Sequence, residues 1–383
     1  MASIILCSIA MLAFLSVLLF FVAQVFIGKK VSVKAMIIIM AVFTISATII
    51  SYFLVGNESH DLTRYYAMLD ELKQHDFAYA FTSFKYKATP LTSLWFFTIA
   101  KLGNYHLLQT LPTLMSFACI SYVAIDVYKQ QQNIRNFSIA FLVCFVCVEQ
   151  IFILTTVRYY CALALLGLAI YRYVFKNKTD FFSIALIIIA CLIHYGCAIV
   201  LIAALLCMHN LKNFNIFYVF STPILIFLAK VLMLIRIPFV FDFGDYLYSY
   251  IIAETIGHHY IIETVIFLVL FAFIYSIVYY NSIEYKRQKI MNHWGNLQSN
   301  SNMHYVVANL ALFIAGLALC SQFLRRFSIV IIMIIFPQLV VLMHRIENKI
   351  LQWFIRLAFL AIAISLVIFQ IGQFKEWTFS FIG

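Results

Sequence analysis

Ionisable side chains gather at a few places in an otherwise apolar chain. The first is Asp61-Leu-Thr-Arg64-Tyr65-Tyr66, where the spacing i, i+3 and i+4 puts Asp61, Arg64 and Tyr65 on one face of a helix. A carboxylate can accept a proton from an attacking hydroxyl group, and a guanidinium group can bind phosphate oxygens. The same residues also fit a simpler arrangement, in which Asp61 begins a helix and forms a local ion pair.

A second group lies near Thr155-Thr156-Val157-Arg158-Tyr159-Tyr160, which separates two apolar segments. Glu149 precedes this turn by about two helical turns. A buried carboxylate has to be paired, protonated or hydrated, so Glu149 is either a catalytic candidate or a structural partner of an arginine. Arg158 either binds a ligand or extends its charged group to the membrane surface.

His194 lies in Cys191-Leu-Ile-His194-Tyr195-Gly196, between two apolar segments that are short for a membrane crossing. An imidazole there could exchange a proton near neutral pH. A histidine on an apolar face can also be an ordinary core residue, and the sequence leaves both interpretations open.

Two further polar segments follow. Segment 236–259 interleaves acids with aromatic residues, a pattern suited to sugar rings, and its sugar-binding candidates are Asp242, Asp245, Tyr246 and His258. An amphipathic interfacial segment is the alternative. The spacing of these residues is not a zinc pattern, so we predict no metal and no cofactor.

Arg325 and Arg326 form a doublet that we predict in an outer turn between spans 304–323 and 327–343. Arginine is unusual on the outer side of a membrane protein, because Lys and Arg are favoured in cytoplasmic loops. A diphosphate group would compensate the two charges, and anionic lipid headgroups are the alternative.

The elements that carry these residues are predicted to be membrane helices. The chain has 383 residues, of which 65% are hydrophobic and only 11% are charged, and apolar runs recur throughout. We predict an all-α polytopic integral membrane protein of about 12 transmembrane helices, at about 3–27, 35–55, 107–127, 136–156, 158–175, 181–194, 196–208, 215–235, 260–280, 304–323, 327–343 and 351–372. A re-entrant or interfacial helix is predicted near 91–106.

The loops fix the predicted orientation. Lysines and arginines mark alternate loops as cytoplasmic if the N-terminus is outside. We therefore interpret the net charge of +11 as basic residues that anchor cytoplasmic loops, and it does not indicate a nucleic-acid partner. Residues 1–383 form one predicted membrane domain, in which outer loops 56–90 and 236–259 contribute the active-site cavity. The pair Cys144 and Cys147 lies inside an apolar run and is interpreted as packing.

Four stretches, in this order, resemble the EpsG family of bacterial polysaccharide proteins, which is related in role to Wzy-type O-antigen and capsule polymerases. They are Asp61-Leu-Thr-Arg64-Tyr65-Tyr66, Val157-Arg158-Tyr159-Tyr160-Cys161-Ala162-Leu163-Ala164, Leu192-Ile193-His194-Tyr195-Gly196, and Arg326-Phe327-Ser328 running to Phe336-Pro337. Tyr159 stands where the family often has glutamine, and the tyrosine expected after Arg326 is missing.

The resemblance implies a glycosyltransferase that polymerises undecaprenyl-diphosphate-linked repeat units into surface polysaccharide. It implies a multi-pass protein of the bacterial inner membrane, with its active site facing the periplasm or exterior and with a flippase and a chain-length regulator as partners. Asp61 is the expected base, with His194 and Glu149 as other catalytic candidates. Arg64, Arg158, Arg325 and Arg326 are the expected diphosphate ligands, and Tyr65 joins the sugar-binding set. A lipid-linked glycan flippase or other transporter and a membrane acyltransferase are the alternative functions.

Overall fold

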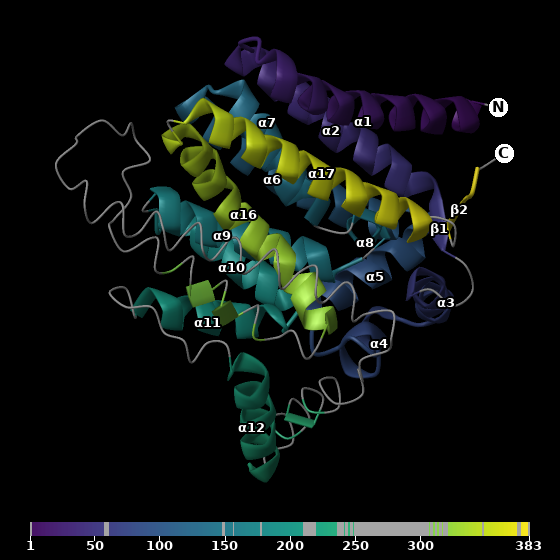
Figure 1. Cartoon of the computed structure of the whole chain (residues 1–383). Coiled ribbons are helices and arrows are strands. Elements are labelled where there is room, and N and C mark those ends of the chain that lie inside the picture. The colour runs from purple at the N-terminus through teal and green to yellow at the C-terminus, as the bar shows by residue number, and fades with distance from the viewer. Residues whose placement is uncertain are drawn as a thin grey trace. The chain divides into compact units, whose positions relative to one another are not determined.

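The computed structural model describes most of the N-terminal half of the chain and parts of the remainder: residues 2–56, 61–147, 150–155, 157–176, 178–209, 220–235, ten separate positions between 241 and 316, and 321–346, 348–373 and 377–381. These residues are mostly helical (Figure 1). They divide into two compact units, which are considered separately: 1–199 with 295–297 and 332–383, and 200–294 with 298–331.

The described helices are α1 (Ala2–Ile27), α2 (Val33–Phe53), α3 (Asp61–Gln74), α4 (Phe77–Thr82), α5 (Pro90–Leu102), α6 (Leu107–Gln131), α7 (Ile134–Cys147), α8 (Gln150–Thr155), α9 (Tyr159–Lys176), α10 (Phe181–Ile193), α11 (Cys197–His209), α12 (Ser221–Leu234), α16 (Ser321–Arg345) and α17 (Lys349–Gln373). The short strands β1 (Leu54–Gly56) and β2 (Trp377–Phe379) pair antiparallel, with Val55 opposite Thr378. The described structure is therefore α-helical apart from this one strand pair.

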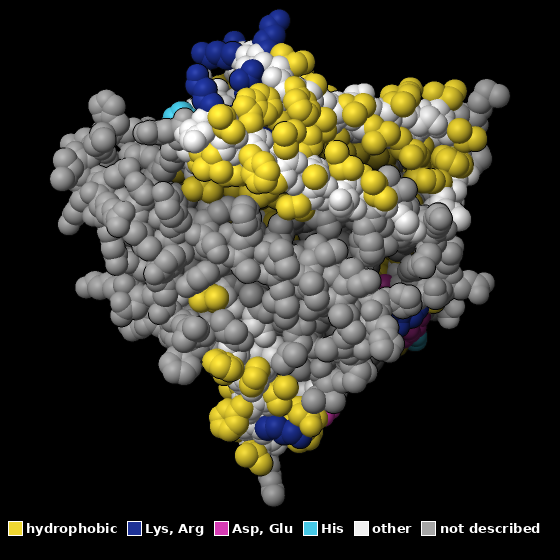
Figure 2. Space-filling model, viewed as in Figure 1, with side chains coloured by type: hydrophobic (Ala, Val, Ile, Leu, Met, Phe, Trp, Pro, Cys, Tyr) yellow, Lys and Arg dark blue, Asp and Glu magenta, His cyan; other side chains and the backbone are white. Residues whose placement is uncertain are grey.

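Apolar helices support a membrane location. Among the described residues, α1, α2 and α6 are long and apolar enough to cross a membrane, judged by length and composition, and several shorter apolar helices accompany them. Large apolar side chains such as Leu12, Leu19 and Ile38 are more than 60% exposed, and Figure 2 shows a broad hydrophobic surface. A surface of this kind is expected to face lipid. The total of about 12 spans stays a prediction.

The apolar segments that are short for a membrane crossing form short helices in the structure. The predicted pair 181–194 and 196–208 is seen as α10 and α11, which are separated at His194. In segment 91–106 the structure has α5, whose 13 residues are too few to cross a bilayer. The position of α5 relative to the membrane stays a prediction.

The position of the arginine doublet has to be corrected. The sequence predicted an outer turn at Arg325 and Arg326, whereas α16 runs without interruption from Ser321 to Arg345 and includes both residues. Residues 321–330 contain no glycine or proline, so nothing in them ends a helix. Even Pro337 is accommodated inside α16.

Hydroxyl groups connect the helices of the first unit, in which α2 packs on α1 and α6. Thr44 and Ser121 share a hydrogen bond of 2.8 Å between α2 and α6, and Ser51 donates to the Leu154 carbonyl at 2.6 Å. Aromatic rings fill the space between these contacts, as with Phe43, whose ring centroid lies 4.8 Å from that of Phe145. Small polar side chains of this kind allow close helix packing in lipid.

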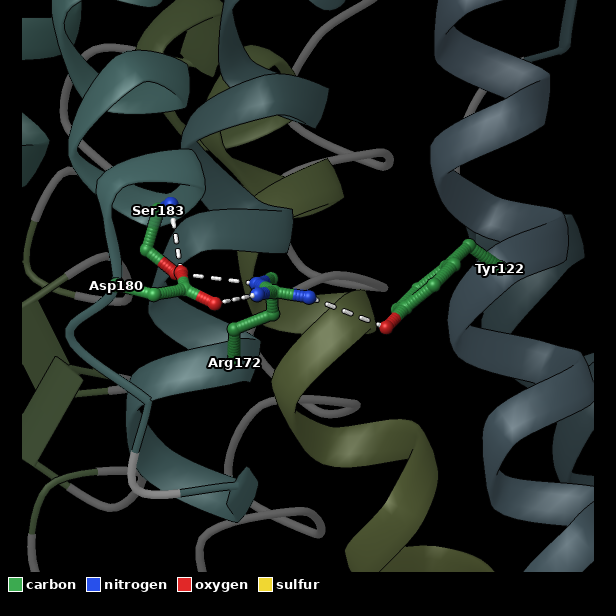
Figure 3. A network of polar contacts seen from close by, with 4 residues as sticks. All are labelled: Tyr122, Arg172, Asp180 and Ser183. Carbon is green, nitrogen blue, oxygen red and sulfur yellow. Dashed lines mark hydrogen bonds and ion pairs between the residues drawn. The ribbon is translucent and has the colours of Figure 1, made fainter.

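A charged network joins α6, α9 and α10 at the end of α9 (Figure 3). The buried Arg172 donates to Ser183 Oγ at 3.0 Å and to Tyr122 OH at 3.2 Å, and it forms an ion pair with Asp180. Asp180 also caps α10, and the Ser183 backbone N–H lowers the pKa of this carboxyl group. The network fixes the end of α9 that is remote from Arg158.

The segment between α2 and α6 folds into a small helical layer. Helices α3, α4 and α5 bury one hydrophobic cluster against the main bundle, made of Leu62, Tyr65, Leu69, Leu72, Ala80, Phe84, Phe96, Ile99, Ala100, Leu108 and Val157. Because Val157 belongs to the turn before α9, this cluster ties the layer to the turn that carries Arg158. The predicted loop 56–90 is thus a packed structure over its described residues.

Candidate functional site

The structure describes only part of the predicted site. Asp61, Arg64 and Tyr65 lie on α3, Arg158 precedes α9, and His194 lies between α10 and α11. Asp245 is exposed in the second unit. Glu149, Asp242, Tyr246 and His258 lie outside the described residues, as do the side chains of Arg325 and Arg326.

The first turn of α3 presents an acid and a base to solvent. Asp61 and Arg64 form an ion pair, and their side chains remain 55% and 66% exposed respectively. An exposed pair of this kind contributes about 0–1 kcal/mol to stability, so the fold does not depend on it. The ion pair can therefore break at small energetic cost, which leaves the Asp61 carboxylate and the Arg64 guanidinium group able to bind a ligand.

Tyr65 points away from this pair. Its side chain is only 9% exposed and packs among the rings of the hydrophobic cluster, with its centroid 5.6 Å from Phe96 and 6.3 Å from Tyr86. The spacing in the sequence placed Tyr65 on the face of Asp61, but the core contacts of α3 draw its ring inward. We therefore infer that the Tyr65 ring packs against Tyr86 and helps to hold it in place.

Arg158 is held by an aromatic ring. Its guanidinium carbon lies 3.8 Å from the centroid of Tyr86, a cation–π contact worth about 0.5–2 kcal/mol. The Arg158 carbonyl accepts the first helical hydrogen bond of α9, from Ala162 N at 3.0 Å. The arginine thus stands at the N-terminus of an 18-residue helix, where the helix dipole also favours an anion.

His194 occupies the break between two helices. Its side chain is 6% exposed, and its Nδ1 accepts a hydrogen bond of 3.0 Å from the Gly196 backbone N–H. The His194 carbonyl accepts from Cys197 N at 3.0 Å, so α11 begins directly after it. An imidazole that accepts at Nδ1 is neutral and carries its proton on Nε2, which makes it a hydrogen-bond donor at that atom.

One dipeptide brings these two residues together. Arg158 contacts Tyr86, and the next residue, Tyr159, lies edge-on to His194 with ring centroids 4.3 Å apart. Thr92 of α5 also donates to the Ile193 carbonyl at 2.7 Å, which joins the α3–α5 layer to the same break. The arginine and the imidazole thus contact successive or adjoining parts of the same turn, and we treat them with the N-termini of α9 and α11 as one candidate site, which we call the Arg158–His194 site.

The sequence did not single out Tyr86, Tyr159 or Thr92 for roles here. Tyr86 lies in Lys85-Tyr86-Lys87, where an aromatic residue between exposed lysines was the available signal. Its partner could not be identified, because the contact joins segments about 70 residues apart and follows no helical or strand period.

A second polar group, also missed in the sequence, lies at the start of α6. Tyr66 donates to Gln109 Oε1 at 3.1 Å, and Asn104 donates to Tyr52 OH at 3.0 Å. Burial lowers the pKa of the neighbouring His106, and a hydrogen bond with the Tyr52 backbone partly offsets the shift. His106 is thus uncharged at neutral pH, while burial raises the pKa of Tyr66 to about 12 and keeps its hydroxyl protonated.

No group of three or more His, Cys, Asp or Glu side chains is arranged to hold a metal ion within the described residues. Asp242 and His258 lie outside them, so they are not covered by this finding. The Arg158–His194 site can bind an anion through its arginine and helix N-termini, and a hydrogen-bond acceptor through its imidazole.

Comparison of the chain with models of known protein families, with curated proteins and with solved structures gives no match. The functional argument therefore depends on the residues themselves.

Replacement of Gly196 should disturb His194 directly. A Cβ atom at Gly196 would lie 2.8 Å from His194 Nδ1, so Gly196→Ala must displace the imidazole or the helix break. We expect a loss of about 1–3 kcal/mol of stability and a change in the ¹⁵N NMR signals of His194. Thermal unfolding and histidine-labelled NMR in detergent would measure both.

Gly372→Ala is the matched control, because a Cβ atom there meets nothing within 4 Å. Equal unfolding midpoints for the two variants, with unchanged His194 signals, would contradict the described packing of the imidazole.

Proposed function

We propose that this protein polymerises lipid-diphosphate-linked oligosaccharide repeat units into a surface polysaccharide, at the outer face of the bacterial inner membrane. The observation that carries the proposal is the Arg158–His194 site: a guanidinium group held on Tyr86, two helix N-termini and an imidazole that accepts a hydrogen bond at Nδ1, in a protein that also exposes an Asp61–Arg64 ion pair at the start of α3. The resemblance of four sequence stretches to the EpsG family gives the reaction class.

The leaving group explains the need for cations. In glycosyl transfer from a lipid diphosphate, the bond between the anomeric carbon and a phosphate oxygen breaks, and both bonding electrons stay on the diphosphate. Arg158 and the N-terminus of α9 would stabilise this developing charge. Arg64 is a further candidate, because its exposed ion pair with Asp61 holds it weakly. Arg325 and Arg326 remain diphosphate candidates from the sequence alone.

The acceptor hydroxyl group has to lose a proton as the new glycosidic bond forms. We assign this proton to Asp61, whose carboxylate is exposed and becomes a free acceptor when Arg64 turns to the phosphate. The hydrogen bond from Gly196 occupies His194 Nδ1, so Nε2 carries a proton and the imidazole is poorly suited to take a further proton from the acceptor. His194 is therefore a binding residue in this scheme and the second choice as base.

Amphiphilic substrates fit a protein of this kind. Lipid tails would stay in the bilayer beside the exposed apolar helices, while the sugars react at the outer face. Asp242, Asp245, Tyr246 and His258 remain sugar-binding candidates, and Glu149 a further catalytic candidate. A flippase and a chain-length regulator would be the protein partners, and no cofactor is required.

Loss of Arg158 should slow transfer without unfolding the protein. We expect Arg158→Ala to reduce the polymerisation rate by about 10²–10³-fold, as for removal of one group that stabilises developing negative charge. Arg158→Lys should also be impaired, because lysine lacks the planar fork that matches phosphate oxygens. The assay uses purified protein, lipid-linked repeat unit and separation of the products by length.

Lys87→Gln is the control, since it removes an exposed positive charge one residue from Tyr86. Near-normal rates for both Arg158 variants at normal protein levels would remove phosphate binding by Arg158 from the proposal.

The assignment of the base can be tested in the same assay with different variants. Asp61→Asn keeps the size of the side chain but cannot accept the proton, so we expect it to lose polymerisation almost completely. His194→Gln keeps a hydrogen-bond donor and should retain partial activity. If Asp61→Asn is active and a folded His194→Gln is inactive, the imidazole is the base.

A further inference from the structure

Two arginines converge at the end of the first unit that is opposite the Arg158–His194 site. Arg135 lies in the first turn of α7, and Arg356 lies at the start of the third turn of α17. Both guanidinium carbons face the ring of Trp353, at 5.9 and 5.2 Å from its centroid. Arg356 also donates to Asn136 Oδ1 at 2.8 Å. We call these four residues the Arg135–Arg356 cluster.

The location of the cluster follows from the ends of three helices. Tyr128, near the end of α6, donates to the Val31 carbonyl just before α2, at 2.7 Å. Arg135 donates to the Phe26 and Ile27 carbonyls at the end of α1, at 3.2 and 3.0 Å. His106 and Leu54 lie at the other ends of α6 and α2. The cluster therefore lies on the side that the lysine distribution marks as cytoplasmic.

Several buried donors in the cluster have no acceptor among the described residues. Arg356 is only 4% exposed and Asn136 is fully buried, yet Arg356 Nε, Arg135 Nε and Asn136 Nδ2 make no hydrogen bond. All three are N–H donors, so an oxygen-rich ligand would satisfy them together. A buried donor left without an acceptor is destabilising, and a charged one more so, so a ligand that supplies acceptors is favoured here.

The charge of the cluster is also uncompensated. No acidic side chain pairs with Arg135 or Arg356 in the part of the chain that the structure describes. The C-terminal carbonyls of α1 provide partial negative charge for Arg135. Among the described residues, the hydrogen-bond acceptor of Arg356 is the neutral amide oxygen of Asn136. Two guanidinium groups with free donors match the oxygens of a phosphate group.

The surroundings indicate that this phosphate belongs to a lipid. Exposed apolar side chains border the cluster on α1 and α17, including Ile27 at 61%, Ile350 at 82% and Phe354 at 70% exposure. Arg135 and Trp353 are half-buried, so the cluster is accessible from this surface. Figure 2 shows Lys and Arg side chains at one edge of the hydrophobic surface. Acyl chains could cover the apolar residues while the headgroup reaches the arginines.

We infer that the Arg135–Arg356 cluster is a binding site for the phosphate group of an anionic phospholipid in the cytoplasmic leaflet. The site is separate from the proposed transfer reaction, and it would hold the ends of α1, α7 and α17 together. The lipid phosphate would accept hydrogen bonds from Arg356 Nε and Arg135 Nε, with the chains lying along Ile350 and Phe354.

Lipid-dependent stability tests this inference. Purified protein in detergent is mixed with phosphatidylglycerol, with phosphatidylcholine or with inorganic phosphate, and unfolding midpoints and bound lipids are measured by thermal shift and native mass spectrometry. We expect phosphatidylglycerol to bind and to raise the midpoint, with little effect of the other two. Arg356→Gln should weaken phosphatidylglycerol binding by about tenfold, the loss expected for one charge-assisted hydrogen bond.

The control Lys30→Gln removes an exposed charge at the same end of the unit and should retain normal binding. Arg135→Gln provides a second variant if Arg356→Gln does not fold. Equal stabilisation of the wild-type protein by phosphatidylcholine would overturn the inference, and so would equal loss of binding in Lys30→Gln. Full stabilisation by inorganic phosphate alone would contradict a lipid ligand.

Discussion

The candidate site depends on the burial of Val157 in the hydrophobic cluster of the α3–α5 layer. Because Val157 is fixed there, Arg158 is held on Tyr86, and Tyr159 meets His194 as α9 begins. Thr92 secures the same arrangement from α5 through the Ile193 carbonyl. Apolar packing between distant segments thus positions the polar groups, which in a membrane protein need partners wherever they are shielded from water.

Buried cationic side chains are paired in different ways at different places in the first unit. At the end of α9 remote from Arg158, Arg172 bonds to Asp180, Ser183 and Tyr122, and Lys176 pairs with Asp126 at 2.7 Å. Those residues stabilise the bundle. The Arg135–Arg356 cluster instead has buried N–H donors that pair with no acidic side chain among the described residues, which is the arrangement expected where an anionic ligand binds.

Much of this organisation could be predicted from the amino-acid sequence because lipid exposure demands long apolar segments. Those segments identified α1, α2 and α6, and the polar break at His194 separated α10 from α11. The doublet at Arg325 and Arg326 was predicted in a turn because charge was taken to mark a loop, although the local residues favour a helix.

The contacts that build the site could not be predicted in the same way. Tyr86 with Arg158 and Tyr159 with His194 join distant segments, and only the tertiary structure determines such pairs. Tyr65 shows a related limit: its spacing to Asp61 places both residues on one helix face, whereas packing decides which of the two side chains is buried.

Polymerisation itself is tested most directly by deleting the gene and resolving surface glycan by size on a gel. The account predicts that the ladder of chain lengths collapses to a single repeat unit and returns with the wild-type gene; an unchanged ladder, or complete loss of the glycan, would contradict it.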